Sequence, residues 1–165
     1  MDIKGYKAFN NDMTNRYGKL FHEGETYSID EKPKFGNDGV GFHFCKRLED
    51  TLRYFPAMEE EIKIAEVTGL GDIVTYEDEY YGYYDMYCTN MIRIDKILSR
   101  EEILAMYLDY PSHWVNRFLQ GFRLTEKEIE QFRLFYSDDY DVLNTISYYQ
   151  EGKLDTYKKI YQYRK

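Results

Sequence analysis

The spacing of apolar residues changes character near residue 98, and this change constrains the fold more than any other feature of the sequence. Before it, short extended segments such as IKGYKAF and GFHFC are separated by turns rich in Gly, Asn and Asp. After it, apolar residues recur with a helical period, and capping-box patterns begin at Ser99 and Thr125. Strands followed by helices predict an α+β protein.

We therefore expect a small antiparallel or mixed β-sheet domain over residues 1–98. Residues 99–165 are predicted to form a bundle of short helices, either an extension packed on the sheet or part of one single domain. Strands are predicted at residues 3–9, 40–44, 61–68 and 90–97, with a hairpin centred on Gly24 and residues 72–76 as a bulged partner of 61–68. Residues 76–90 read as irregular. Helices are predicted at residues 48–54, 100–109, 112–120, 125–136, 139–150 and 154–163.

The net charge of −8 and the isoelectric point near 5.0 argue against direct nucleic-acid binding, which needs a basic face. The sequence has no apolar run of the roughly 18 residues that a membrane span requires, and its first residues lack the apolar segment of a signal peptide. Two cysteines in such a chain are typical of reduced thiols. We predict a cytoplasmic protein of a bacterial host cell.

His43 and Cys45 are the first candidates for chemistry, because alternate residues of a strand share one face, roughly 6.5–7 Å apart. They could join His22 and Cys88 in a metal site, or act as a Cys–His nucleophilic pair. The histidines and cysteines form none of the usual ligand spacings, and no Asn or Asp is placed to orient His43. We favour a packing role, with Phe42 and Phe44 facing the core, and predict no metal site.

The strongest compositional feature is an acidic segment at residues 57–90. It holds nine acidic residues and the single base Lys63, so its net charge of −8 equals that of the whole chain. The simplest interpretation is a solvated surface. The functional one is an anionic, tyrosine-rich contact surface that mimics nucleic-acid phosphates toward a host protein with a basic surface. Its predicted contact residues are Glu77, Asp78, Glu79, Tyr80, Tyr81, Tyr83, Tyr84 and Asp85.

Several segments follow one another in an order that resembles an uncharacterised family of small domains found in phages and prophages. These are IKGYKAFN, GETYSI, GFHFC with an amphipathic turn ending at Tyr54, IAEVTGLGDIV and TNMIRIDKILS. The resemblance covers residues 3–99 and implies an origin in a phage or mobile element. It carries no assigned activity.

The run GVGFHFCKRLEDTLRYF, followed by IKIAEVTGL, is also similar to the middle of the ADP-ribosyltransferase fold. The resemblance implies a nicotinamide pocket lined by Tyr27, His43 and Tyr54, with NAD as the cofactor. This chain carries Lys7 where that family has a His or Arg that grips NAD. No glutamate matches the catalytic position of that family, since Glu101 and Glu102 fall in a predicted helix cap.

The sequence leaves three candidate functions for the protein. The first is a protein-binding factor without a cofactor, an inhibitor of a host nucleic-acid-handling or defence protein in the manner of a DNA mimic or anti-CRISPR protein. The second is an ADP-ribosyltransferase-like enzyme that binds NAD, or an inactive relative of one. The third is a structural or regulatory domain without a ligand.

Overall fold

The computed structural model describes residues 2–36, 39–55, 57–77 and 85–151. The chain divides into two compact units. The sheet unit comprises Met1–Pro56 and Glu60–Ser99, and the helical unit comprises Ala57–Glu59 and Arg100–Lys165. The helix predicted at residues 154–163 lies outside the described residues.

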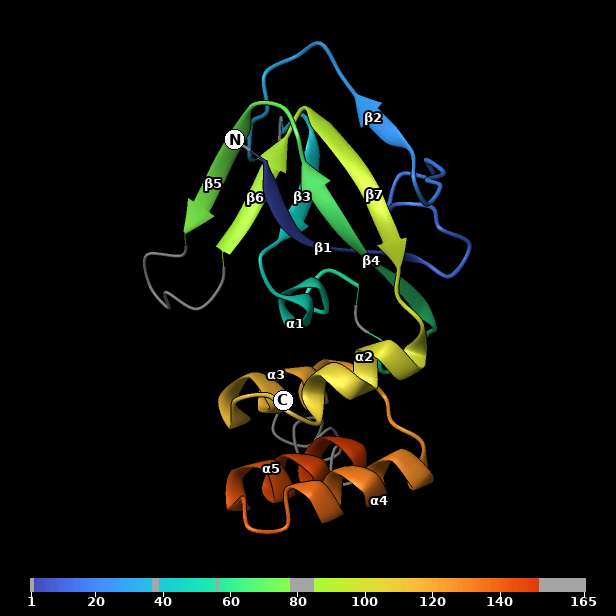
Figure 1. Cartoon of the computed structure of the whole chain (residues 1–165), viewed down its shortest axis with the longest axis vertical. Coiled ribbons are helices and arrows are strands. Elements are labelled where there is room, and N and C mark those ends of the chain that lie inside the picture. The colour runs from blue at the N-terminus through green and yellow to red at the C-terminus, as the bar shows by residue number, and fades with distance from the viewer. Residues whose placement is uncertain (1, 37–38, 56, 78–84, 152–165) are drawn as a thin grey trace, which may run out of the picture. The chain divides into compact units, whose positions relative to one another are not determined.

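The sheet unit holds one seven-stranded antiparallel sheet, and several short helices follow it in the chain, which confirms the predicted α+β class (Figure 1). The strand order is β2-β7-β4-β1-β3-β6-β5, so β2 and β5 are the edges. The strands are β1 (Ile3–Asn10), β2 (Thr26–Ser28), β3 (Phe42–Cys45), β4 (Ile62–Gly69), β5 (Ile73–Glu77), β6 (Asp85–Thr89) and β7 (Met91–Ile97). The short helix α1 (Leu48–Thr51) follows β3 and packs on β1 and β3.

Two predicted strand pairings were wrong. Residues 26–28 do not close a local hairpin around Gly24, because β2 pairs with β7 while Phe21, from the expected partner segment, is buried in the core. Residues 73–77 pair with β6 rather than with β4. Strand β6 lies within the stretch that was expected to be irregular, and its last two residues, Cys88 and Thr89, are both buried.

A cluster of buried apolar side chains lies on one face of the sheet, while Ala8 and Ile64 are buried on the other face. Alternation along β3 directs Phe42 and Phe44 into this cluster, as predicted, beside Phe9 and Phe21. The rings of Phe9 and Phe21 are 5.2 Å apart between centroids, and those of Phe21 and Phe42 are 6.2 Å apart and edge-on. Such packing fixes the orientation of β1 and β3, the two strands that carry the site described below.

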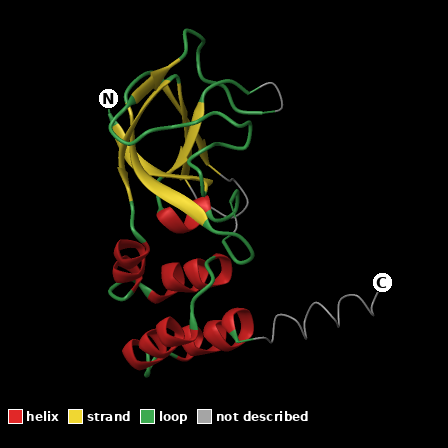
Figure 2. Ribbon diagram, turned by 90° about the vertical axis from the view of Figure 1, so that its right-hand side faces the viewer, coloured by secondary structure: helices red, strands yellow, loops and turns green. Residues whose placement is uncertain are grey.

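The helical unit contains four described α-helices and a π-helical turn (Figure 2). They are α2 (Arg100–Tyr107), α3 (Ser112–Gly121), α4 (Glu126–Phe135), α5 (Tyr140–Thr145) and the turn η1 (Ile146–Gln150). The predicted capping box of α4 is present: Thr125 accepts from the Glu128 amide at 3.2 Å, and the Glu128 carboxylate accepts from the Thr125 amide at 2.8 Å. No helix among the described residues is long and apolar enough to cross a membrane.

Residues 57–59 belong to the helical unit although they lie between two parts of the sheet unit in the sequence. Ala57 forms an isolated parallel bridge with Phe122. Its amide donates to the Gly121 carbonyl at 2.9 Å, and its carbonyl accepts from the Arg123 amide at 3.1 Å. The side chain of Arg123 donates to the Met58 carbonyl at 3.3 Å. The chain thus visits the helical unit before β4 begins.

Candidate functional site

The residues predicted for a partner-binding surface fall mostly outside the described part of the chain. Glu77 ends β5 and Asp85 begins β6, and these two residues are register partners in the sheet. Asp78, Glu79, Tyr80, Tyr81, Tyr83 and Tyr84 lie outside the described residues. The acidic surface therefore stays a prediction.

Two of the three residues predicted for a nicotinamide pocket line one cavity. His43 and Tyr54 both contribute to a cavity of about 370 Å³ in the sheet unit, together with Lys7. Tyr27 does not line it. Its hydroxyl accepts from the His22 amide at 2.8 Å and donates to Glu25 at 3.0 Å, and its ring packs edge-on against Phe21. We call this hollow the Lys7 cavity.

The walls of the Lys7 cavity come from five segments that are distant in the sequence. They are the middle of β1, the loop at residues 15–17, the turn at residues 35–36, strand β3 with Gly41 before it, and the residues around α1; Met86 of β6 completes the lining. The strands and the short helix α1 among these could be predicted from sequence patterning. The loop residues Arg16, Tyr17 and Phe35 were missed, because nothing in a local pattern reveals which loops meet.

The position of Lys7 follows from the way β1 meets β3. Their ladder is short, with Tyr6 opposite Cys45. Gly5 permits this approach, because a Cβ there would overlap the carbonyl oxygen of Cys45. One residue past the paired position, the Lys7 amine donates a hydrogen bond to the His43 carbonyl at 2.6 Å. A side-chain nitrogen thus reaches the β3 backbone at the cavity wall.

Burial dominates the titration of Lys7. Desolvation lowers the pKa of its amine from 10.5 to about 8, and the positive charge of Arg16 acts in the same direction. The thiols of Cys45 and Cys88 offset part of this effect. Burial also lowers the pKa of His43, and the neighbouring Lys7 lowers it further. His43 is therefore neutral at physiological pH, while the Lys7 amine is neutral in a sizeable share of molecules.

No Asp or Glu occurs among the described residues that line the Lys7 cavity, although the chain carries a net charge of −8. Its ionisable nitrogen groups are those of Lys7, Arg16 and His43. Arg16 donates to the Tyr54 carbonyl at 3.4 Å, which ties the loop after β1 to the segment after α1. This excess of basic over acidic groups makes the cavity suited to an anion.

Aromatic rings form the remainder of the wall. Phe35 meets the His43 ring edge-on, with centroids 5.2 Å apart, and its other neighbour is Tyr76, at 5.6 Å. Tyr17 is 88% exposed and Tyr54 is 39% exposed, so both present ring surface to solvent at the cavity. Exposed rings beside basic groups are suited to stacking on a flat ligand.

Cys88 is poorly suited to act as a nucleophile beside His43. His43 is the register partner of Cys88, and Cys45 is the partner of Met86, so the two thiols lie on the face that His43 shares. Both are buried and reduced. The Cys88 thiol donates to the Val40 carbonyl at 3.3 Å, and burial raises its pKa, which disfavours a thiolate. Among the described residues no three His, Cys, Asp or Glu side chains are grouped as metal ligands.

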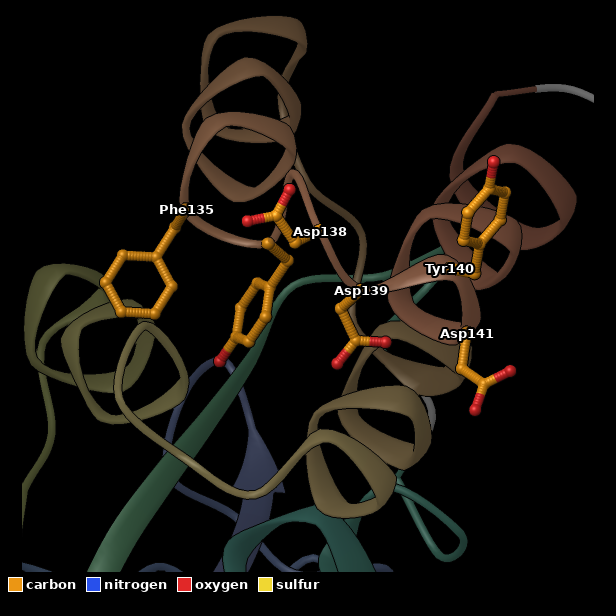
Figure 3. Close-up of a pocket in the computed structure, with 6 residues that line it drawn as sticks. Phe135, Asp138, Asp139, Tyr140 and Asp141 are labelled. Carbon is orange, nitrogen blue, oxygen red and sulfur yellow. The ribbon is translucent and has the colours of Figure 1, made fainter.

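A second hollow, of about 410 Å³, lies in the helical unit between the end of α4 and the start of α5. We call it the acidic depression; it is lined by Phe135, Tyr136, Asp138, Asp139, Tyr140 and Asp141. Its three carboxylates point in different directions rather than toward one point (Figure 3). Asp139 accepts from the Val142 amide at 3.2 Å and so caps α5. Here one of the three acidic residues, Asp139, serves a helix end.

The fold and the cavity together define an α+β protein whose antiparallel sheet carries a basic, aromatic-lined pocket. The chain belongs to the family described as Domain of unknown function (DUF7666), whose family model matches residues 3–106. No curated protein and no solved structure matches the chain. The matched segment includes every described residue that lines the Lys7 cavity, whereas the residues of the acidic depression lie outside it.

Proposed function

We propose that the sheet unit binds a nucleotide-like ligand in the Lys7 cavity, with NAD as the first candidate. The observation that carries this proposal is that the described residues lining the cavity include three basic side chains, Lys7, Arg16 and His43, and no acidic one, in a chain of net charge −8. A phosphate gains charge-assisted hydrogen bonds from such groups. NAD is the candidate because the resemblance to the ADP-ribosyltransferase fold implied it and because His43 and Tyr54 line this cavity.

In the proposed complex, Lys7 and Arg16 contact the phosphates, while Phe35, Tyr54 and Tyr17 offer rings to the base or the nicotinamide. The cavity volume of about 370 Å³ lies near the lower end of the ~300–1,000 Å³ of ligand pockets. It suits one half of a dinucleotide, with the other half over the exposed ring of Tyr17.

Binding, rather than turnover, is the activity that this lining supports. Catalysis of the ADP-ribosyltransferase type is expected to use a glutamate, and none of the described lining residues is acidic. The proposal is therefore a nucleotide-binding relative of that fold. Incubation with NAD and measurement of free nicotinamide tests this point: release that disappears in His43→Ala would make the protein an enzyme.

The binding proposal is tested by calorimetric titration with NAD and with ATP, supported by thermal unfolding, since a ligand that binds the native state raises its stability. Lys7→Met should weaken binding by about 10- to 100-fold, the loss expected for a charged hydrogen bond. Lys4→Met is the matched control, because Lys4 lies exposed on the same strand. The proposal is wrong if neither nucleotide binds at millimolar concentration, or if both variants weaken binding equally.

In a second candidate function, the acidic segment binds a partner protein. We propose that residues 77–85 contact a host protein with a basic surface, in the manner of a phage-encoded inhibitor. The negative charge of the segment supports this proposal. So do the strands on either side of it, since β5 is an edge strand and Glu77, at its end, is the register partner of Asp85, at the start of β6. Capture from host lysate should fall with added salt. It should also fall in a variant with Glu77, Asp78 and Glu79 changed to the amides, whereas Lys7→Met should leave it unchanged.

A further inference from the structure

The geometry around Lys7 points to a nucleophilic amine. We propose that Lys7 forms an imine with the aldehyde of an anionic sugar, such as the open form of ribose 5-phosphate or of ADP-ribose, bound in the Lys7 cavity. This inference rests on the proposed function, because it requires the basic groups of the cavity to hold the phosphate of the ligand.

Three features of the cavity place a reactive amine next to an anion. The Lys7 nitrogen lies at the wall and is held by the His43 carbonyl at 2.6 Å. A carbonyl accepts a hydrogen bond from the neutral amine as well as from the ammonium ion, so the amine stays in place when it loses its proton. No carboxylate among the described lining residues pairs with Lys7, and Arg16 offers its guanidinium to a phosphate beside it.

The surroundings of Lys7 favour the neutral amine. Desolvation and the charge of Arg16 lower the pKa of Lys7 to about 8, with a partial offset from Cys45 and Cys88. Strand β4 places Ala65 opposite Lys7, with Glu66 opposite Tyr6 and Lys63 opposite Phe9, while the α1 acids Glu49 and Asp50 are outside the cavity lining. At about pH 7.5 an amine with a pKa of about 8 is neutral roughly two hundred times more often than one at 10.5.

The covalent step needs no oxidant or reductant. The lone pair of the neutral amine attacks the aldehyde carbon, so a C–N bond forms and the carbonyl electron pair moves to oxygen. The two protons of the nitrogen pass to that oxygen, which leaves as water, and a C=N bond remains on Lys7. When the imine takes up one proton from solvent, its N–H can again donate to the His43 carbonyl, so the hydrogen bond that holds the free amine also holds the product.

The experiment uses the full chain, ribose 5-phosphate and cyanoborohydride, which reduces the imine to a stable secondary amine. Peptide mass spectrometry should find the adduct on Lys7 at least tenfold above that on the exposed residues Lys4 and Lys19. Labelling should increase with a midpoint near pH 8. Ribose without phosphate, at equal concentration, should label Lys7 far less. Lys7→Arg should remove the adduct while keeping the charge, and Lys4→Arg should not change it.

The outcomes separate the two proposals. Binding of NAD, which has no aldehyde, together with labelling that follows exposure would overturn the nucleophilic role and leave the proposed function standing. Labelling of Lys7 that NAD does not compete with would support the nucleophile and overturn nucleotide binding at this cavity. Equal labelling by ribose and ribose 5-phosphate would overturn the anionic class of ligand. Because the adduct is measured on the wild-type chain, a variant that fails to fold does not hide the answer.

Discussion

The Lys7 cavity and the acidic depression are similar in volume, about 370 and 410 Å³, and opposite in charge. In the acidic depression, Asp139 already has its partner in the amide of Val142, and the three carboxylates diverge (Figure 3). In the Lys7 cavity, the basic groups of Lys7 and Arg16 use backbone carbonyls, which are neutral acceptors. Asp139 thus has a structural role as a helix cap, whereas Lys7 and Arg16 have only neutral partners among the described residues, as the proposed anionic ligand requires.

The family match divides the two hollows in the same way. Residues 3–106 contain the whole Lys7 cavity and end within α2, before the acidic depression begins. The family match therefore falls mainly on the sheet unit. The predictions below test whether the two hollows differ as described.

The largest expected effect is on the pH dependence of stability. In the folded chain the pKa of Lys7 is about 8, below the 10.5 of an unburied lysine. Between these values the unfolded state binds more protons, so the free energy of unfolding should rise with pH by up to about 3 kcal/mol. Urea unfolding across this range should show the rise in the wild type and in Lys4→Met, and lose it in Lys7→Met. Equal slopes in all three would show that Lys7 is not desolvated.

Gly5→Ala should destabilise the sheet unit by about 1–3 kcal/mol, the range for inserting atoms into a packed site. The added methyl group overlaps the Cys45 carbonyl, so β1 and β3 must separate, and NAD binding should weaken because Lys7 moves with β1. Gly24→Ala is the control. It strains a residue with φ of +84° but meets no atom within 4 Å, so it should lower stability without changing NAD affinity.

Asp139→Ala should cost about 1 kcal/mol of stability in the helical unit through loss of the α5 cap. Asp139→Asn should lose only a few tenths of a kcal/mol, because an amide oxygen still accepts from the Val142 amide. Helix content by circular dichroism and thermal unfolding measure the difference. NAD should bind the sheet unit equally well in both variants. A weakened affinity would contradict the view that the acidic depression has only a structural role.

The smallest effect is expected from Asp138→Asn combined with Asp141→Asn. Exposed carboxylates away from caps and cores change stability by no more than about 0.5 kcal/mol. The double variant should therefore unfold like the wild type and bind NAD equally well. A larger loss of stability would show that these two side chains, like Asp139, support the helix ends.

The sequence predicted those parts of the fold that depend on local periodicity. The capping box at Thr125 and Glu128 is present as predicted. Phe42 and Phe44 both face the core, because alternate residues of a strand point to the same side of the sheet. The pairing of strands was harder to predict than their positions, since β2 pairs with β7, which lies more than sixty residues later in the sequence. Strand β6 was missed because its sequence, DMYCT, shows no clear apolar alternation and follows a stretch rich in tyrosine and acidic residues.

The site was predictable only in part. His43 and Tyr54 came from a resemblance, which also singled out Lys7 as a departure from the expected His or Arg. Arg16 and Phe35 lie on loops, and their meeting with β1 and β3 depends on the path of the chain between them. Tyr27 was wrongly expected beside His43, because the sequence does not reveal that β2 lies at the sheet edge, three strands away from β1. The lack of acidic groups among the described lining residues is a three-dimensional property and has no linear signature.

The excursion of residues 57–59 into the helical unit has a consequence for how the chain can be divided. A truncated chain that ends at Ser99 would leave the Ala57 amide and carbonyl without Gly121 and Arg123, their hydrogen-bond partners. A fragment that begins at Arg100 would lack the only segment that pairs with Phe122 among the described residues. The two units are thus interleaved in sequence, and a single cut after Ser99 keeps the sheet unit whole but separates residues 57–59 from the rest of the helical unit.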